Sequence, residues 1–296
     1  MNNLLFLQNP SINATVMSVS KLAISCDIIA PGSLPIYCCI DFFNTRNLSS
    51  NFTVKQMFAF CGVKYSTNSA SCIARANEAF DTLYNNGIIL EPVKIQRITD
   101  VITTFNSPEI FTKQASEKKI YFRTFYFEEY WAIINYKAGR GRSVSHGNLL
   151  RHYMYLRHCI HQNSIWKKRA YNAKNPDYAY ISMEAVAAAL GSSVEQTSAC
   201  CHALKDLGLI YFDNPMSIVD CGIFKNQNTI FVATHCPADP EYCWQMEYVK
   251  GYYKTLEILE AELQKRGGQT DMTYIVAKLP KEIADFLEAR KQAGHT

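Results

Sequence analysis

The sequence offers few residues whose types and spacing could carry out catalysis or hold a metal ion. His158 and His161 are three positions apart in His158-Cys-Ile-His161, so on a helix they would share one face. No Asp or Glu in the surrounding segment could complete a metal site. The chain also contains no Cys-x-x-Cys, no Gly-x-Ser-x-Gly, no Walker pair and no Cys-His nucleophile context. We therefore expect no enzyme activity, no catalytic residues, no metal and no cofactor.

Positive charge is concentrated between residues 113 and 174. This stretch holds thirteen Lys and Arg against three Glu, an excess of ten, whereas the whole chain carries +4, so the remainder sums to −6. The cations are Lys113, Lys118, Lys119, Arg123, Lys137, Arg140, Arg142, Arg151, Arg157, Lys167, Lys168, Arg169 and Lys174. Such a belt predicts contact with DNA phosphates, although part of it can equally be a solvated face. The candidates for phosphate contact are Arg140, Arg142, Lys167, Lys168 and Arg169.

The elements that must position a DNA-reading surface are found between Ile181 and Phe212. Ser182 caps a predicted short helix, Gly191 permits a sharp turn, and Ser193 caps a second helix. The second helix is expected to turn Val194, Thr197, Cys201 and Leu204 inward and Glu195, Gln196, Ser198, Ala199, His202 and Lys205 outward. Because this order resembles the helix-turn-helix core of winged-helix domains, the candidate DNA-contacting residues of this helix are Gln196, Ser198, His202 and Lys205.

A wing hairpin is predicted after the second helix. Its strands are expected at Leu209–Asp213 and Thr229–Ala233, with the tip at Asn226-Gln227-Asn228. That tip would reach the DNA backbone or the minor groove.

The same order of signals occurs earlier in the chain as a degenerate internal repeat. Phe52-Thr53 corresponds to Ile181-Ser182, Cys61-Gly62 to Leu190-Gly191, and Asn86-Gly87-Ile88-Ile89 to Leu207-Gly208-Leu209-Ile210. The glycines are separated by 24 residues in the first copy and by 16 in the second. Arg75, in the longer helix of the first copy, is that copy's candidate DNA-contacting residue.

The predicted fold is therefore mostly α with small β hairpins (α+β): two winged-helix domains plus C-terminal helices. The expected divisions are an N-terminal winged-helix-like domain at 1–112, a basic connecting segment at 113–143, a second winged-helix domain at 144–240 and a helical extension at 241–296. In that extension Val249, Tyr252, Leu256, Leu259 and Leu263 form a narrow apolar seam. This seam predicts either a homodimer through 249–263 or a helix folded back over its own domain.

Cysteine placement and hydropathy indicate a cytoplasmic protein. The eleven cysteines are odd in number, include the adjacent pairs Cys38-Cys39 and Cys200-Cys201, and lie mostly in apolar stretches, as expected of reduced core thiols. No secretory signal is recognisable at Met1–Pro10. No apolar run approaches the roughly 18 residues that a membrane span requires, so we expect no membrane association.

Two stretches carry a resemblance to a known class of proteins. Gly147-Asn-Leu-Leu-Arg-His-Tyr-Met-Tyr-Leu-Arg157 and Tyr180-Ile-Ser-Met-Glu-Ala-Val-Ala-Ala-Ala-Leu-Gly191 resemble replication initiators of plasmids and mobile elements, and phage replisome organisers. The resemblance extends over about residues 33 to 235. It implies binding to double-stranded DNA at origin repeats and recruitment of host replication proteins. A winged-helix transcriptional regulator and an adaptor that binds only proteins are the alternatives.

Overall fold

The computed structural model describes residues 16–20, 29–45, 47–64, 69–108, 122–137, 144–160, 177–235 and 242–293. The chain divides into two compact units, each made of non-contiguous segments. Unit 1 comprises 1–158, 189–192 and 199–207, and unit 2 comprises 159–188, 193–198 and 208–296. Helices α9 (Met183–Leu190) and α10 (Val194–Asp206) contribute residues to both. The described elements form a mixed α+β fold with two- and three-stranded antiparallel sheets, as the sequence predicts at this level.

Unit 1 holds the first copy of the repeat. Its elements in chain order are β1 (Val16–Ser20), the 3-10 helix η2 (Pro31–Ser33), α3 (Leu34–Phe42), β2 (Ser49–Thr53), α4 (Val54–Phe60), α5 (Ser69–Asn85), β3 (Val101–Phe105), β4 (Phe122–Tyr126), α7 (Phe127–Ile134) and α8 (His146–Cys159, whose last residue belongs to unit 2). Strand β2 pairs with β3, and β1 with β4. Thr53 caps α4 as Ser182 was expected to cap its counterpart: its Oγ1 accepts a hydrogen bond from the Gln56 amide, while the Gln56 side chain accepts one from the Thr53 amide.

Residues 122–134, within the stretch expected to be a basic connecting segment, form β4 and α7, and α7 is part of the core of unit 1. The Phe127 ring stands 5.7 Å from that of Phe60, and the Tyr130 hydroxyl donates a hydrogen bond to the Phe60 carbonyl at 3.0 Å. Gly62 approaches α7 so closely that a Cβ added to it would lie 2.5 Å from Cγ2 of Ile134. The aromatic residues Tyr126, Phe127 and Tyr130 of this stretch are thus buried in unit 1.

Unit 2 is built around two three-stranded sheets and a long helix. Its elements are β5 (Tyr178–Ile181), parts of α9 and α10, β6 (Ile210–Asp213), β7 (Met216–Asp220), β8 (Ile223–Asn226), β9 (Thr229–Ala233), α11 (Trp244–Lys265), β10 (Thr273–Ala277) and α12 (Lys281–Gln292). The sheet orders are β5-β9-β6 and β10-β7-β8. The two strands predicted for the wing do pair, as β6 and β9. Strands β7 and β8, which lie between β6 and β9 in the chain, form an additional hairpin that was not predicted from the sequence.

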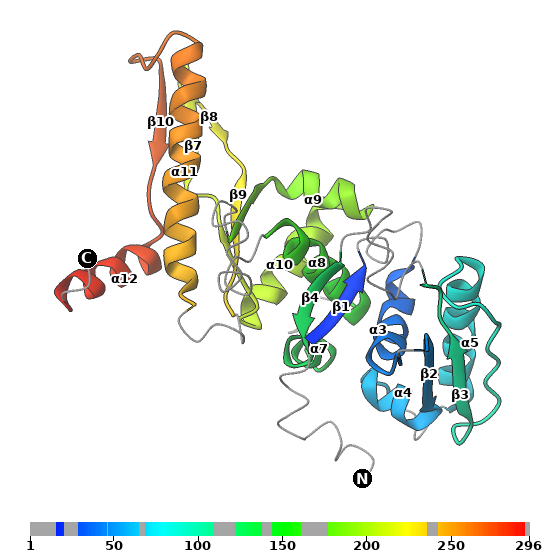
Figure 1. Ribbon diagram of the computed structural model, residues 1–296. Helices are drawn as coiled ribbons and strands as arrows, with labels where there is room; N and C mark the ends of the chain where they lie inside the picture. The colour runs from blue at the N-terminus through cyan, green and yellow to red at the C-terminus, as the bar shows by residue number, and fades with distance from the viewer. Residues whose placement is uncertain are drawn as a thin grey trace. The chain divides into compact units, whose positions relative to one another are not determined.

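The apolar seam of α11 is covered by its own unit. Val249, Tyr252, Leu259 and Leu263 are all buried, and all but Leu263 belong to one cluster with residues of β6, β7 and β9. Figure 1 shows α11 running along the sheet that contains β7, β8 and β10. Of the two outcomes expected for this seam, the structure has the folded-back helix. The strands of unit 2 cover the seam, so these buried residues are not exposed to a second copy.

The internal repeat extends to individual hydrogen bonds. Gly62 and Gly191 follow the short helices α4 and α9 with φ of 66° and 58°, and Gly87 and Gly208 follow the long helices with φ of 68° and 67°. These left-handed conformations favour glycine.

Backbone pairing matches at the same points. In the first copy, Ile89 bridges Asn106, and the Ser107 amide donates to the Ile88 carbonyl. In the second copy, Ile210 pairs with Ala233, and the Thr234 amide donates to the Leu209 carbonyl. Each copy thus runs strand, short helix, long helix, return strand, although Ile88–Leu90 of the first copy forms only an isolated bridge through Ile89.

Candidate nucleic-acid interface

Helix α10 begins at a side-chain cap, as predicted. The Gln196 amide donates to Ser193 Oγ at 3.1 Å. Helix α9 begins in the same way, with the Ala185 amide donating to Ser182 Oγ at 3.1 Å. At the start of α10, hydrogen bonds from its own amide and from Ser193 lower the pKa of Glu195, so this fully exposed carboxylate is ionised at neutral pH. The first turn of α10 therefore carries a negative charge at the surface.

The inward face of α10 packs with small apolar groups. Thr197, Cys201 and Leu204 are buried as predicted, together with Cys200 and Ala203. Val194 is the exception, since 37% of it is exposed at the first position of the helix. Burial raises the pKa of the Cys200 and Cys201 thiols to about 12, which keeps both protonated. These two cysteines consequently act as small core residues.

The outward face of α10 leaves polar groups at the surface. Gln196 and His202 are exposed, and Ser198 and Lys205 are partly exposed. None of these candidates is packed into the protein interior. An exposed polar edge opposite a buried face is the arrangement that a groove-reading helix requires.

The turn between the strands predicted as a wing lies elsewhere than expected. Hairpin β7–β8 turns at Cys221-Gly222, both in the left-handed region with φ of 50° and 80°. Phe224 beside this turn is 65% exposed, and Lys225 pairs with Asp220 at 2.7 Å. The predicted tip at Asn226–Asn228 instead joins β8 to β9. The fifteen residues between β6 and β9 are enough to form a hairpin of their own, which moves the turn away from Asn226-Gln227-Asn228.

Part of the basic belt is buried. Arg151 and Arg157 of α8 are almost inaccessible, so they are unavailable to phosphate. Arg157 Nη2 lies 3.8 Å from Oε1 of Glu129, which also accepts a hydrogen bond from the Tyr126 amide through Oε2. Both side chains of this ion pair are buried, and burying either charge would be costly without the other. Expecting these two arginines in a phosphate-tracking surface was wrong.

The remaining cations of the belt are mostly beyond what the structure describes. Lys137 is exposed. The phosphate candidates Arg140, Arg142, Lys167, Lys168 and Arg169 lie outside the described residues, as does His161 of the paired histidines. Within the described ranges, no group of three His, Cys, Asp or Glu is arranged to hold a metal ion. In the same ranges no helix has both the length and the apolarity to cross a bilayer.

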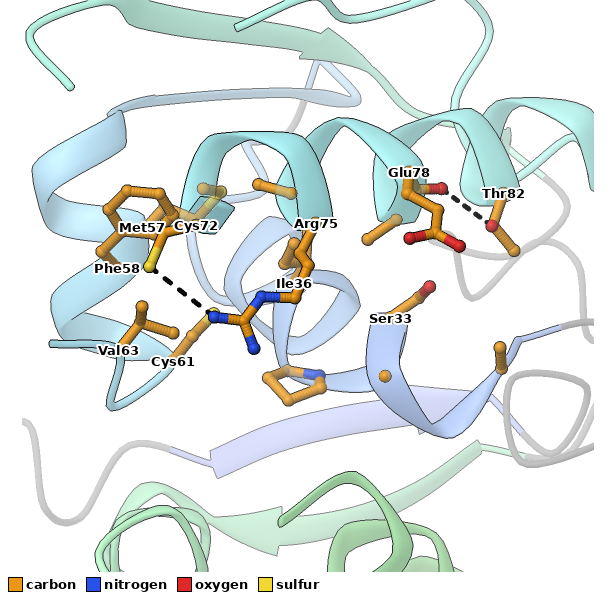
Figure 2. A pocket seen from close by; sticks show the side chains of 15 residues that line it. Ser33, Ile36, Met57, Phe58, Cys61, Val63, Cys72, Arg75, Glu78 and Thr82 are labelled. Atoms are coloured by element: carbon orange, nitrogen blue, oxygen red, sulfur yellow. Dashed lines mark hydrogen bonds between the residues drawn. The ribbon is translucent and has the colours of Figure 1, made fainter. Parts of the chain in front are cut away.

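In the first copy, α5 occupies the place of α10. Its buried residues Cys72, Ala76, Ala79, Phe80 and Leu83 recur at spacings of three and four. Arg75 is exposed on this helix and donates a weak hydrogen bond to Cys72 Sγ at 3.8 Å. It also lines a cavity beside α5, shown in Figure 2. No pattern in the sequence indicates this cavity, because its walls come from three separate segments.

No family model matches this chain, and no curated protein matches it.

Proposed function

We propose that the protein binds double-stranded DNA in a sequence-specific manner through α10, as part of replication initiation or replisome organisation on a plasmid, phage or mobile element. The observation that carries the proposal is the polar edge of α10, with Gln196 and His202 exposed while Thr197, Cys201 and Leu204 on the other side are buried. The duplicated order of capped short helix, glycine turn, long helix and paired strands supports two winged-helix units.

In this proposal the two kinds of contact are separate. Gln196, Ser198 and His202 would read base edges, and Glu195 could accept from a cytosine amino group. Phosphates would be held by Lys205 and by the cations predicted from the basic stretch, namely Arg140, Arg142, Lys167, Lys168 and Arg169. The role is binding without catalysis. The nine cysteines in the described ranges are all free thiols, which supports a reducing compartment such as the cytoplasm.

A protein-docking role is the second candidate, and local charge favours it. Residues 178–235 contain five acids, namely Glu184, Glu195, Asp206, Asp213 and Asp220, against Lys205 and Lys225. An acidic surrounding weakens phosphate attraction, so DNA binding must draw on the basic belt. A winged-helix regulator of transcription would share the DNA contacts of the first proposal. Bound sites arranged as direct repeats favour an initiator, and a single palindrome favours a regulator.

The test begins with duplexes selected from a random pool, followed by fluorescence anisotropy at 50 and 200 mM salt. With roughly six phosphates contacted, affinity should fall about a thousandfold between these concentrations. Absence of binding to any duplex at low salt would leave only the protein-docking role.

Three variants then separate base reading from phosphate contact. Gln196→Ala with His202→Ala should change the selected sequence, whereas Lys167→Ala with Lys168→Ala and Arg169→Ala should weaken binding to all sequences alike. Gln264→Ala with His235→Ala removes the same side-chain types at exposed positions outside α10 and should leave both properties unchanged. Equal behaviour of the first two variants would contradict the assignment of α10 as the reading helix.

A further inference from the structure

Unit 1 contains a cavity of about 380 Å³ between α5, the start of α3 and the end of α4. Its floor is apolar and consists mainly of Ile36, Met57, Phe58, Cys61 and Ala76, all nearly inaccessible to solvent. A gap remains between the helices because α5 places the small residues Cys72, Ala76 and Ala79 along this side. The volume lies within the range of small-molecule pockets and is far larger than one water molecule.

Three polar side chains line the same cavity. In Figure 2 the guanidinium of Arg75 reaches down from α5 toward Cys61, while Glu78 lies further along the helix, with Ser33 on the opposite wall. Among the described residues, no carboxylate lies within ion-pair distance of Arg75 and no cation within that distance of Glu78. Arg75 donates only to Cys72 Sγ, a weak acceptor, which leaves most of its N–H groups free for a ligand.

Ser33 provides an independent indication of a ligand. Its side chain belongs to a residue that is only 4% exposed, and its hydroxyl makes no hydrogen bond within the described part of the chain. Figure 2 shows this hydroxyl directed into the cavity on the side of Glu78. This hydroxyl oxygen is open to the cavity, so a polar atom of a ligand there could form a hydrogen bond with it.

The chemistry of these groups defines the ligand. A planar guanidinium matches a carboxylate, and a carboxylate beside a hydroxyl oxygen matches an ammonium group with its three donors. Both sites border one apolar floor. We propose that this cavity binds a free apolar α-amino acid, with its carboxylate on Arg75, its ammonium on Glu78 and Ser33, and its side chain over Ile36, Met57 and Phe58.

A ligand with only one of the two charges fits less well. A simple carboxylic acid would leave Glu78 and Ser33 without a partner and would bring a second anion beside Glu78. An apolar amine would leave Arg75 unpaired. Only the zwitterion satisfies both ends, so removing either charged group from the ligand should lower its affinity. This assignment does not depend on DNA binding.

The test uses the full chain labelled with ¹³C at the methionine methyl groups. Met57 lines the cavity and Met272, exposed in unit 2, is the internal reference. L-leucine should shift the Met57 signal and leave the Met272 signal in place, with a Kd on the order of 1 mM, as expected for about nine heavy atoms. The analogues 4-methylpentanoate, which lacks the ammonium, and 3-methylbutan-1-amine, which lacks the carboxylate, should each bind at least fivefold more weakly.

Variants test the same pairings from the protein side. Arg75→Gln should weaken leucine binding at least fivefold and should not weaken binding of the amine, whereas Glu78→Gln should weaken leucine binding and should not weaken binding of the acid. Ala79→Leu fills the cavity and should abolish all three interactions, and Lys94→Gln, an exposed cation elsewhere in unit 1, should change nothing. The ligand series on the unaltered chain decides the matter even if a variant fails to fold. Met57 unmoved by 50 mM leucine, or either analogue binding as tightly as leucine, would overturn the proposal.

Discussion

The buried histidine of α8 gives unit 1 a calculable dependence on pH. His152 is 1% exposed, and burial, aided by the neighbouring Arg151, lowers the pKa of its imidazole to about 4 against the opposing effect of its 2.7 Å contact with the Asn148 carbonyl. In the unfolded chain the pKa is about 6.5. Between these two values the unfolded state binds a proton that the folded state does not. The stabilising contribution is therefore complete above pH 6.5, declines as the pH falls, and is lost below pH 4.

The size of the effect follows from the two pKa values. Lowering the pH from 7.5 to 5.0 crosses about 1.5 units of the window, and each unit corresponds to about 1.4 kcal/mol. Unit 1 should thus lose about 2 kcal/mol of unfolding free energy through His152 alone.

The perturbation is His152→Asn, which keeps a donor near the position of Nδ1 and does not titrate. Urea unfolding at both pH values can be followed by Trp131 of α7, in a chain whose Trp166 and Trp244 are replaced by Phe. We expect the variant to be less stable at pH 7.5 but to lose about 2 kcal/mol less than the parent chain on acidification. Leu149→Ala, a core truncation in the same helix, should lower stability and keep the parent's pH dependence.

Equal pH dependence in the parent and His152→Asn chains would refute the reasoning. It would mean that the imidazole is protonated without cost in the folded state, and hence that α8 is not buried at this position.

Three further predictions concern packing, and all are measured by urea unfolding. Gly62→Ala should destabilise unit 1 by about 2 kcal/mol or more, since it combines a left-handed φ with a Cβ 2.5 Å from Ile134. Gly87→Ala has nearly the same φ but open space around the new Cβ, so it should cost only about 1 kcal/mol. Equal costs would contradict the close approach of α7. Leu259→Ala should destabilise unit 2 by about 2 to 4 kcal/mol and leave the sedimentation coefficient unchanged, because this residue packs inside its own unit; a change in oligomeric state would restore the intermolecular seam. Asn106→Leu should cost about 1 to 3 kcal/mol, because Asn106 Nδ2 donates to Ser50 Oγ at 2.8 Å inside the protein; a neutral result would show that this network is open to water.

Much of the local structure could be predicted because local chemistry decides it. Thr53, Ser182 and Ser193 cap helices in the structure because a short side-chain oxygen satisfies the first free amides of a helix whatever surrounds it. Gly62, Gly87, Gly191 and Gly208 end helices because few other residues tolerate a positive φ. These signals alone were sufficient to align the two copies of the repeat.

Other features required the tertiary structure. Arg151 and Arg157 were predicted to be surface cations, but α8 is buried on nearly every side. Glu129, 28 residues before Arg157 in the chain, supplies the charge that compensates it. The turn lies at Cys221-Gly222 and not at the predicted tip because β7 pairs with β8 and also with β10, which lies 47 residues beyond β8.

The sequence by itself determined where helices begin and end, which positions are duplicated and which face of α10 is polar, since each of these depends on neighbours within a few residues. Only the tertiary structure decided which charges are buried, that α11 covers its own strands, and that Ser33, Arg75 and Glu78 border one cavity. Those outcomes depend on segments distant in the chain meeting in space, and the free energy of burying a side chain depends on its environment as well as on its type.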